Sequence, residues 1–187
     1  RLLRAVGDPQ PSRTRLAVPD HISWESAILF PIADLIATCR QRGVPVLVDG
    51  AHAPGAVPVD IPSLGADWYT ANLHKWAHAP RSCGILWARA DRQSYLHQPV
   101  VSWGSEKGFR WEFEWCATND PTAYLAAPEG IALLEEWGFH AIVRYTHELA
   151  WETATALAER WGTRLDTPRE MIGAMVTVPL PEKAGCT

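Results

Sequence analysis

VPVLVDG, residues 44–50, is the stretch from which the fold of this chain can be predicted. The residues before Asp49 are apolar and mostly β-branched, which is typical of a strand covered on both faces of a parallel sheet. The preceding stretch, PIADLIATCRQRG, predicts a helix in which Pro31 takes the first helical position and Gly43 follows the end. A helix that leads into a buried strand indicates an α/β fold.

More strands are predicted on both sides of this one. ADWYTANLHKW (66–76) and GILWARA (84–90) each contain a strand, and RLAVPDHI (15–22) contains a short apolar run that suits a buried strand. AHAPGAVPVDIPSLG (51–65) is predicted to be a loop with a short helical turn near its end. The alternation of helices and buried strands predicts a sheet that is mainly parallel.

The second half of the chain has a different character. Residues 99–120 are rich in aromatic side chains and are predicted to be irregular. Two helical patterns follow, one from Pro121 to Trp137 and a longer amphipathic one that ends near Trp161. MIGAMVTVPL, residues 171–180, alternates like a strand.

These patterns predict a change of domain near residue 140. We expect residues 1–139 to belong to one large domain, and residues 140–187 to supply a connecting helix and the beginning of a small α+β domain. The chain opens without Met and ends soon after a strand-like run, so we expect both ends to be cuts through a longer protein.

Composition excludes several classes of protein. The chain has 187 residues, 47% of them hydrophobic and 20% charged, which suits a soluble globular protein, and its net charge of −4 does not favour nucleic-acid binding. It contains no apolar run long enough for a transmembrane helix. The cysteines form no CxxC pair, so we expect free thiols in a reducing, cytoplasmic compartment; they are Cys39, Cys83, Cys116 and Cys186.

Two residues carry the chemistry that the sequence predicts. Asp49 ends a buried strand and Lys75 follows a later one, so both side chains can face the crevice at the carboxyl ends of the strands, where α/β proteins bind ligands. A desolvated lysine in such a crevice is a nucleophile toward carbonyl groups. A lysine that forms a Schiff base, together with an acid that partners the ring nitrogen, is the arrangement that holds pyridoxal 5'-phosphate.

The order of motifs adds a family resemblance to this argument. With DHIS, VLVDGAHAPG, ADWYTANLHKW, VVSWG and WCATNDPTAYLA, residues 20–140 resemble the catalytic half of the class V aminotransferase family of pyridoxal-phosphate enzymes, in wording most like isopenicillin N epimerase-like proteins. The resemblance implies a fold type I large domain, in which a mostly parallel sheet is flanked by helices, and a homodimer with shared active sites.

The resemblance also implies roles for three residues near the strand ends. Asp49 matches the aspartate that pairs with the pyridine nitrogen of the cofactor, and Lys75 matches the lysine that forms the Schiff base. His52 matches the position, Gln or His in the family, that contacts the phenolic oxygen of the cofactor. His74 and His78 are four residues apart, the spacing of a zinc-binding pair on a helix. Metal binding is not expected, because Lys75 stands where such a pair would have Glu.

Three further residues match positions that reach the cofactor phosphate. Asn72, in place of the family's usual Ser, and His74 match residues just before the lysine, and Thr118 matches the Thr that reaches the phosphate bound by the other subunit. Two departures accompany them. Ala117 stands where the family has Gly, and Trp24 stands where the family has Ser or Asn near the cofactor ring.

The reaction that the resemblance implies takes place at the α-carbon of an amino acid or amino-acid-derived substrate, with Lys75 as the base. Isopenicillin N epimerase-like activity is the first expectation, and carbon–sulfur lyase, cysteine desulfurase-like or aminotransferase activity are the alternatives. A non-catalytic homologue that keeps the fold as a dimerisation module is the alternative of another class. Because other parts of the family's site are expected outside these residues, we expect the 187 residues alone to be inactive.

The aromatic stretch contains tryptophans and a cysteine whose roles have to be considered. The tryptophans there, Trp103, Trp111 and Trp115, are expected to pack against a dimer partner, and the alternative is that they form a wall of the substrate pocket. Cys116 is a possible nucleophile, but cysteine desulfurases carry theirs on a loop in the C-terminal region, so we assign it no role.

Overall fold

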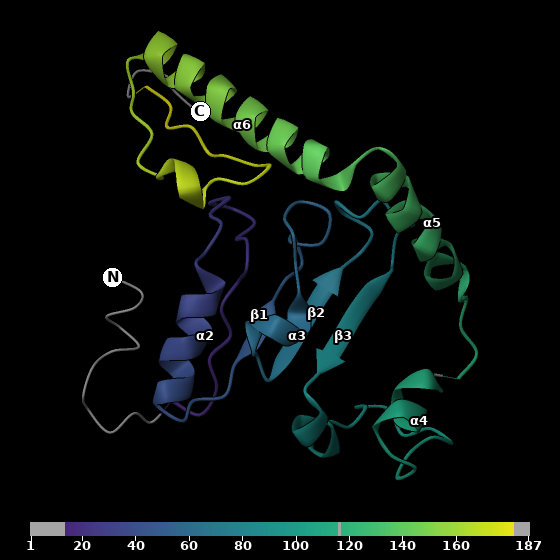
Figure 1. Cartoon of the computed structure of the whole chain (residues 1–187). Coiled ribbons are helices and arrows are strands. Elements are labelled where there is room, and N and C mark those ends of the chain that lie inside the picture. The colour runs from purple at the N-terminus through teal and green to yellow at the C-terminus, as the bar shows by residue number, and fades with distance from the viewer. Residues whose placement is uncertain (1–13, 116, 182–187) are drawn as a thin grey trace.

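The centre of the molecule is a three-stranded sheet. The computed structural model describes residues 14–115 and 117–181 (Figure 1). The strands are β1 (Leu47–Asp49), β2 (Trp68–Asn72) and β3 (Gly84–Ala88), in the order β1-β2-β3. β1 and β2 are parallel, as expected, whereas β3 pairs antiparallel to β2. The connection between β2 and β3 is too short for the crossover helix that a parallel pair requires, so the chain turns back directly.

A short segment before the helix extends the sheet beyond β1. Ala17 and Asp20 form parallel bridges with Val46 and Asp49, respectively. The backbone nitrogen of Ala17 donates to the oxygen of Pro45 at 2.9 Å. The strand expected in residues 15–22 is therefore present as isolated bridges in parallel register with β1.

The core lies between the sheet and α2 (Ile32–Gln41), which Figure 1 shows alongside β1. Apolar side chains of α2 recur at the spacing of one helical face and pack on buried residues of β1 and β2. The predicted helix is confirmed, with Pro31 immediately before its first residue. The predicted turn after β1 is α3 (Ile61–Leu64), where Asp60 accepts from the backbone nitrogen of Ser63 at 3.2 Å.

Two helices before and within the aromatic stretch were not predicted from the sequence. These are a 3-10 helix (Ala90–Tyr95), just before the stretch, and α4 (Phe109–Glu114) within it. Glu112 of α4 is buried, and its carboxylate accepts from the ring of His97 at 3.0 Å and from the backbone nitrogen of Glu106 at 3.1 Å. A helix of this length is too short to show a hydrophobic period, which is why the stretch was expected to be irregular.

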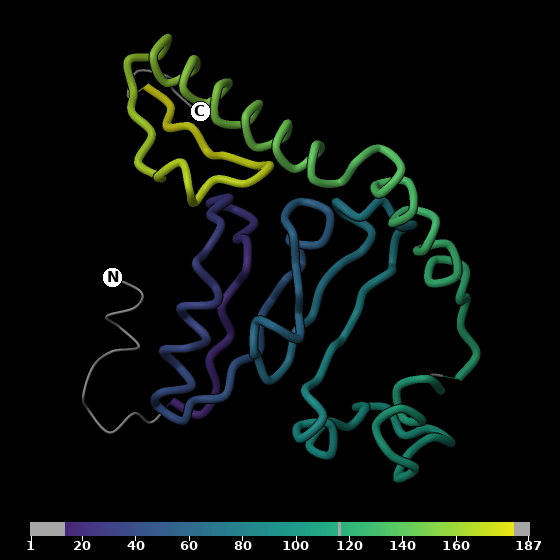
Figure 2. The backbone as a smooth tube through the Cα atoms, viewed as in Figure 1, coloured from purple at the N-terminus to yellow at the C-terminus, as the bar shows by residue number. Residues whose placement is uncertain are grey.

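Two long helices follow, and both were predicted. They are α5 (Thr122–Glu136) and α6 (Phe139–Trp161), separated at Gly138, whose φ is 83°. Figure 2 shows the chain running through α5 and α6 and then returning beneath α6. No helix within the described residues is long and apolar enough to cross a membrane. The division into domains near residue 140 stays a prediction.

The strand predicted at residues 171–180 is wrong. A 3-10 helix (Arg169–Met171) leads into this stretch, and Ile172 alone pairs, in an antiparallel bridge with Ile28. The backbone nitrogen of Leu29 donates to the oxygen of Met171 at 2.8 Å. Alternation of side chains is not sufficient for a strand, because a strand also requires a partner, and no other described segment pairs with this one.

Candidate active site

Asp49 and Lys75 come from the same edge of the sheet. Asp49 is the last residue of β1, and Lys75 follows the end of β2, which runs parallel to β1. The Oδ1 atom of Asp49 accepts a hydrogen bond from the backbone nitrogen of Ala51 at 2.9 Å. This local turn fixes the carboxylate at the strand end.

His52 links the two loops that leave this edge. We call residues 50–57 the aspartate loop and residues 73–79 the lysine loop. The Nζ atom of Lys75 lies 2.9 Å from the Nε2 atom of His52. Burial and then the charge of Lys75 lower the pKa of His52, and the nearby Asp49 and Asp20 oppose this shift. A neutral imidazole whose Nε2 accepts from the lysine is therefore favoured at neutral pH.

The second ring nitrogen of His52 is unsatisfied. The Nδ1 atom is buried and has no hydrogen-bond partner among the described residues. In the tautomer that accepts from Lys75, this nitrogen carries the proton and is a donor. A buried donor without an acceptor is costly, so the site suits a ligand that places an oxygen there.

The two loops dock backbone to backbone. Gly55 has a φ of 88°, and a Cβ atom on it would lie 2.1 Å from the oxygen of Trp76. On the other side, a Cβ atom on Gly130 of α5 would lie 2.7 Å from the oxygen of Ala77. Because both approaches leave no room for a side chain, the lysine loop is held between the aspartate loop and α5.

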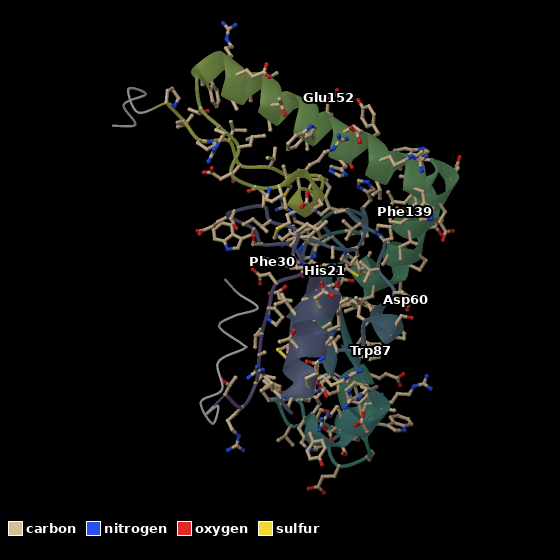
Figure 3. All side chains as sticks on the ribbon, turned by 60° about the vertical axis from the view of Figure 1, so that its left-hand side comes forward. His21, Phe30, Asp60, Trp87, Phe139 and Glu152 are labelled. Atoms are coloured by element: carbon tan, nitrogen blue, oxygen red, sulfur yellow. The ribbon has the colours of Figure 1, made fainter. Side chains whose placement is uncertain are left out.

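A buried aromatic pair supports the aspartate loop, and the sequence argument missed it. The hydroxyl of Tyr69 lies 2.9 Å from the Nδ1 atom of His21, and the ring of Tyr69 leaves no room for a Cβ atom on Gly50. Burial and the charge of Asp49 raise the pKa of Tyr69, and burial lowers the pKa of His21. Figure 3 shows His21 near Phe30, whose backbone nitrogen donates to the oxygen of His21 at 3.0 Å.

Asp20 is a second carboxylate that the sequence argument did not assign. It bridges to Asp49 in parallel register, at the same edge of the sheet. Burial and then the charge of Asp49 raise the pKa of Asp20, and His52 partly opposes them. The available signal was its place at the end of a predicted strand, the same argument that identified Asp49.

Two of the three residues expected to reach a phosphate, Asn72 and His74, lie just before Lys75 in the chain. Asn72 ends β2 and pairs with Gly84 in the antiparallel ladder. The Nδ1 atom of His74 lies 2.9 Å from the backbone oxygen of Cys83. Both side chains are partly buried. Their contact with a phosphate stays a prediction.

The structure does not bring Thr118 to this edge of the sheet within one chain. Thr118 is exposed in the connection between α4 and α5, which Figure 1 shows on the far side of β3 from β1. Ala117 has a φ of 63°, so it adopts the left-handed conformation for which Gly is the usual residue. Trp24 is 71% exposed, and Cys116 lies outside the described residues.

The remaining candidate residues from the sequence are histidines, cysteines and tryptophans. His74 and His78 lie on the lysine loop rather than on one face of a helix. Within residues 14–115 and 117–181, no group of three or more His, Cys, Asp or Glu side chains could hold a metal ion. Cys39 and Cys83 are free and buried. The tryptophans of the aromatic stretch have exposed side chains; Trp103, Trp111 and Trp115 are 84%, 59% and 51% exposed.

Comparison with known proteins shows which family the sequence of this chain matches. A model of the aminotransferase class-V family matches residues 10–184. A putative L-cysteine desulfhydrase 1 of Oryza sativa subsp. japonica is 44% identical over 179 residues, which cover 93% of this chain and 36% of that protein. The isopenicillin N epimerase of Streptomyces clavuligerus is 35% identical over 188 residues and is covered to 47%.

A solved structure shows the same fold at low identity. The apo structure of a cysteine desulfurase from Thermococcus onnurineus NA1 superposes with a TM-score of 0.77 at 18% identity, over 92% of this chain and 45% of that one. This confirms the predicted α/β architecture of fold type I, in partial form. The chain spans less than half the length of these relatives.

Proposed function

Since the chain belongs to the class V aminotransferase family, whose enzymes depend on pyridoxal phosphate, we propose that its strand-end site holds this cofactor for chemistry at the α-carbon of an amino acid. The observation that carries the proposal is the contact of 2.9 Å between Lys75 and His52, at the edge where Asp49 ends its strand. The orphaned nitrogen of His52 supports it, because the phenolic oxygen of the cofactor would supply the missing acceptor.

In this proposal each side chain at the strand ends has one task. Lys75 would hold the aldehyde of the cofactor as a Schiff base, Asp49 would pair with the ring nitrogen, and Asn72 and His74 would reach the phosphate. When bound, the cofactor would withdraw the electrons left at the substrate α-carbon.

Lys75 is also the residue proposed to move the proton at the α-carbon. Its amine is held by His52, which in the neutral form accepts a hydrogen bond from it. The lysine loop is held between Gly55 and Gly130, so the amine approaches from a fixed direction. A base held in this way meets the geometric requirement for general base catalysis.

We further propose that a second copy of the chain completes the site. Thr118 is exposed and lies away from Lys75 within one chain, so its proposed phosphate contact requires the partner of a homodimer. The division into a large domain, residues 1–139, and the beginning of a small one, residues 140–187, belongs to the same proposal.

Elimination of a β-sulfur substituent is our first candidate reaction, and epimerisation is the second. The putative desulfhydrase from rice is 44% identical to the chain, whereas the epimerase from Streptomyces clavuligerus is 35% identical. These identities reverse the order that the sequence motifs alone favoured. Both reactions begin with removal of the α-proton, so the same lysine serves either.

Spectroscopy and two activity measurements test the proposal. The protein is expressed from its complete reading frame with pyridoxal phosphate and scanned for the absorbance band of lysine-bound cofactor. Lys75→Ala should abolish the band, whereas Lys107→Ala, which removes an exposed lysine, should keep it. A wild-type protein without the band would sink the cofactor assignment, and a band in Lys75→Ala would sink that of the lysine.

Incubation with L-cysteine then separates the two candidate reactions. Release of sulfide supports elimination. Exchange of the α-hydrogen of an amino-acid substrate with deuterated water, together with inversion and without loss of a substituent, supports epimerisation. Absence of both from a protein that carries the band would contradict both candidates.

A further inference from the structure

A second carboxylate stands beside Asp49 at the site. Asp20 and Asp49 are bridge partners on parallel strands: the backbone nitrogen of Asp49 donates to Pro19 at 3.0 Å, and that of His21 donates to Asp49 at 2.8 Å. Partners in a parallel ladder direct their side chains to the same face, and neighbouring strands are about 4.8 Å apart. The two carboxylates are therefore neighbours on one face.

Asp20 has no cation of its own within the described chain. Its carboxylate makes no hydrogen bond and no ion pair with the residues that the structure describes, and it is only partly exposed. Burial and then repulsion by Asp49 raise the pKa of Asp20, and the nearby His52 only partly opposes them.

The charges of the whole cluster lead to the same conclusion. Besides the two aspartates, the cluster contains Lys75, which is positive, and His52, which is favoured in its neutral form. The two carboxylates therefore outnumber the one ammonium group. Asp49 also uses its Oδ1 atom to accept from the backbone of Ala51. A cationic group placed at this edge would relieve the repulsion and be bound by both carboxylates.

We propose that Asp20 is a second carboxylate for the ring nitrogen of the cofactor, and that its charge adds to that of Asp49 to favour the protonated ring over a neutral one. This inference rests on the proposed function, in which Asp49 faces that nitrogen. Asp20 acts here as a positioning residue: it sets the electrostatic potential at the nitrogen and takes no part in bond making.

Binding of two ligands to the apoprotein separates this role from a structural one. One ligand is pyridoxal phosphate, and the other is its analogue with carbon in place of the ring nitrogen, which cannot carry the charge. Dissociation constants are measured by quenching of tryptophan fluorescence in the protein expressed from its complete reading frame. Asp20→Asn should raise the constant for pyridoxal phosphate about tenfold, the equivalent of one pK unit, and leave that for the analogue unchanged.

Two further variants serve as controls. Asp34→Asn removes an exposed carboxylate from α2 and should change neither constant. Asp20→Glu keeps the charge and should keep the wild-type ratio of the two constants. Circular dichroism of each apoprotein checks folding, and the Glu variant decides the matter if the Asn variant does not fold.

Three outcomes would overturn the inference. Asp20→Asn could weaken the binding of both ligands equally, or it could leave the binding of both unchanged. The third outcome is that the Asp20→Glu protein loses the preference for pyridoxal phosphate over the analogue. If the wild-type protein fails to bind pyridoxal phosphate, the proposed function fails with it. If the wild type binds the cofactor and Asp20→Asn has the same constants, the inference alone fails.

Discussion

The Nζ atom of Lys75 lies 2.9 Å from the Nε2 atom of His52, and this contact joins the two loops that leave the carboxyl edge of the sheet. The contact gives His52 two tasks, one for each ring nitrogen. Nε2 contacts the lysine, and Nδ1 is buried without a hydrogen-bond partner among the described residues, which is where we propose that a ligand binds.

Replacement of His52 should weaken cofactor binding. His52→Leu removes both nitrogens, and we expect it to weaken cofactor binding by about 1.5–3 kcal/mol, the range for hydrogen bonds to charged groups. His52→Gln keeps one donor and one acceptor and should lose less. The dissociation constant of pyridoxal phosphate measures both effects. Wild-type affinity in the Leu variant would contradict the role of His52.

Gly55→Ala should destabilise the protein by more than its backbone conformation alone explains. Its Cβ atom would lie 2.1 Å from the oxygen of Trp76, and overpacking of this kind costs about 1–3 kcal/mol in addition to the strain of a positive φ. Gly43→Ala is the matched control, because Gly43 has a φ of 66° and nothing within 4 Å of its Cβ position. Urea unfolding compares the two. Equal losses would show that the loops do not dock as described.

Tyr69→Phe should cost about 1–3 kcal/mol, because it leaves the Nδ1 atom of buried His21 without a partner. His21→Phe should cost a similar amount. In the double variant the losses should not add, because the second substitution removes a group that has already lost its partner. Additive losses in urea unfolding would mean that the two side chains do not act as a pair.

Asp67→Asn should be destabilising, by about 1.5–3 kcal/mol, the range for hydrogen bonds to charged groups. Asp67 is buried, pairs with Arg92 at 2.7 Å and with Arg89 at 2.9 Å, and accepts from the backbone nitrogen of Val46 at 2.9 Å. Asp91→Asn removes an exposed partner of the same arginines and should change the midpoint of thermal unfolding much less. A similar shift in both variants would contradict the central position of Asp67.

Stability of the apoprotein should fall as pH drops below about 6.5, the ordinary pKa of histidine. Burial lowers the folded-state pKa of both His21 and His52, so the unfolded chain takes up protons first as pH falls. The loss continues until pH passes below the folded-state values, and it is absent above the unfolded one. Asp20 has a raised pKa and therefore acts with the opposite sign, at lower pH.

Urea unfolding from pH 5 to pH 8 measures this dependence. His52→Gln should flatten the curve below pH 6.5, since one of the two titrating groups is gone. A variant curve as steep as the wild-type curve would show that His52 titrates alike in both states.

Sequence reasoning located Asp49 and Lys75 because their positions depend only on chain order. Asp49 ends β1 and Lys75 follows β2, and the carboxyl ends of parallel strands meet at one edge. Asp20 and the pair of Tyr69 with His21 could not be found in this way. Their contacts depend on which residues of neighbouring strands face each other, and the sequence pattern does not contain that register.

The errors have a related physical cause. The strand expected at residues 171–180 has the right alternation, but apart from Ile172 it has no pairing segment in the part of the chain that the structure describes. α4 is too short to show a period, and it is held by the buried carboxylate of Glu112. Both depend on contacts with residues distant in the sequence, which local patterns do not report.

The bridge between Asp20 and Asp49 also determines which kinds of mutation the site can tolerate. Ala17 and Asp20 pair with Val46 and Asp49 at one constant offset, so a slip of one residue would turn the Asp20 side chain to the other face of the sheet. Insertions or deletions within residues 17–20 should therefore disturb the site more than single substitutions there. The chain length between Ala17 and Asp20, rather than any bond to the Asp20 side chain, keeps this carboxylate in place.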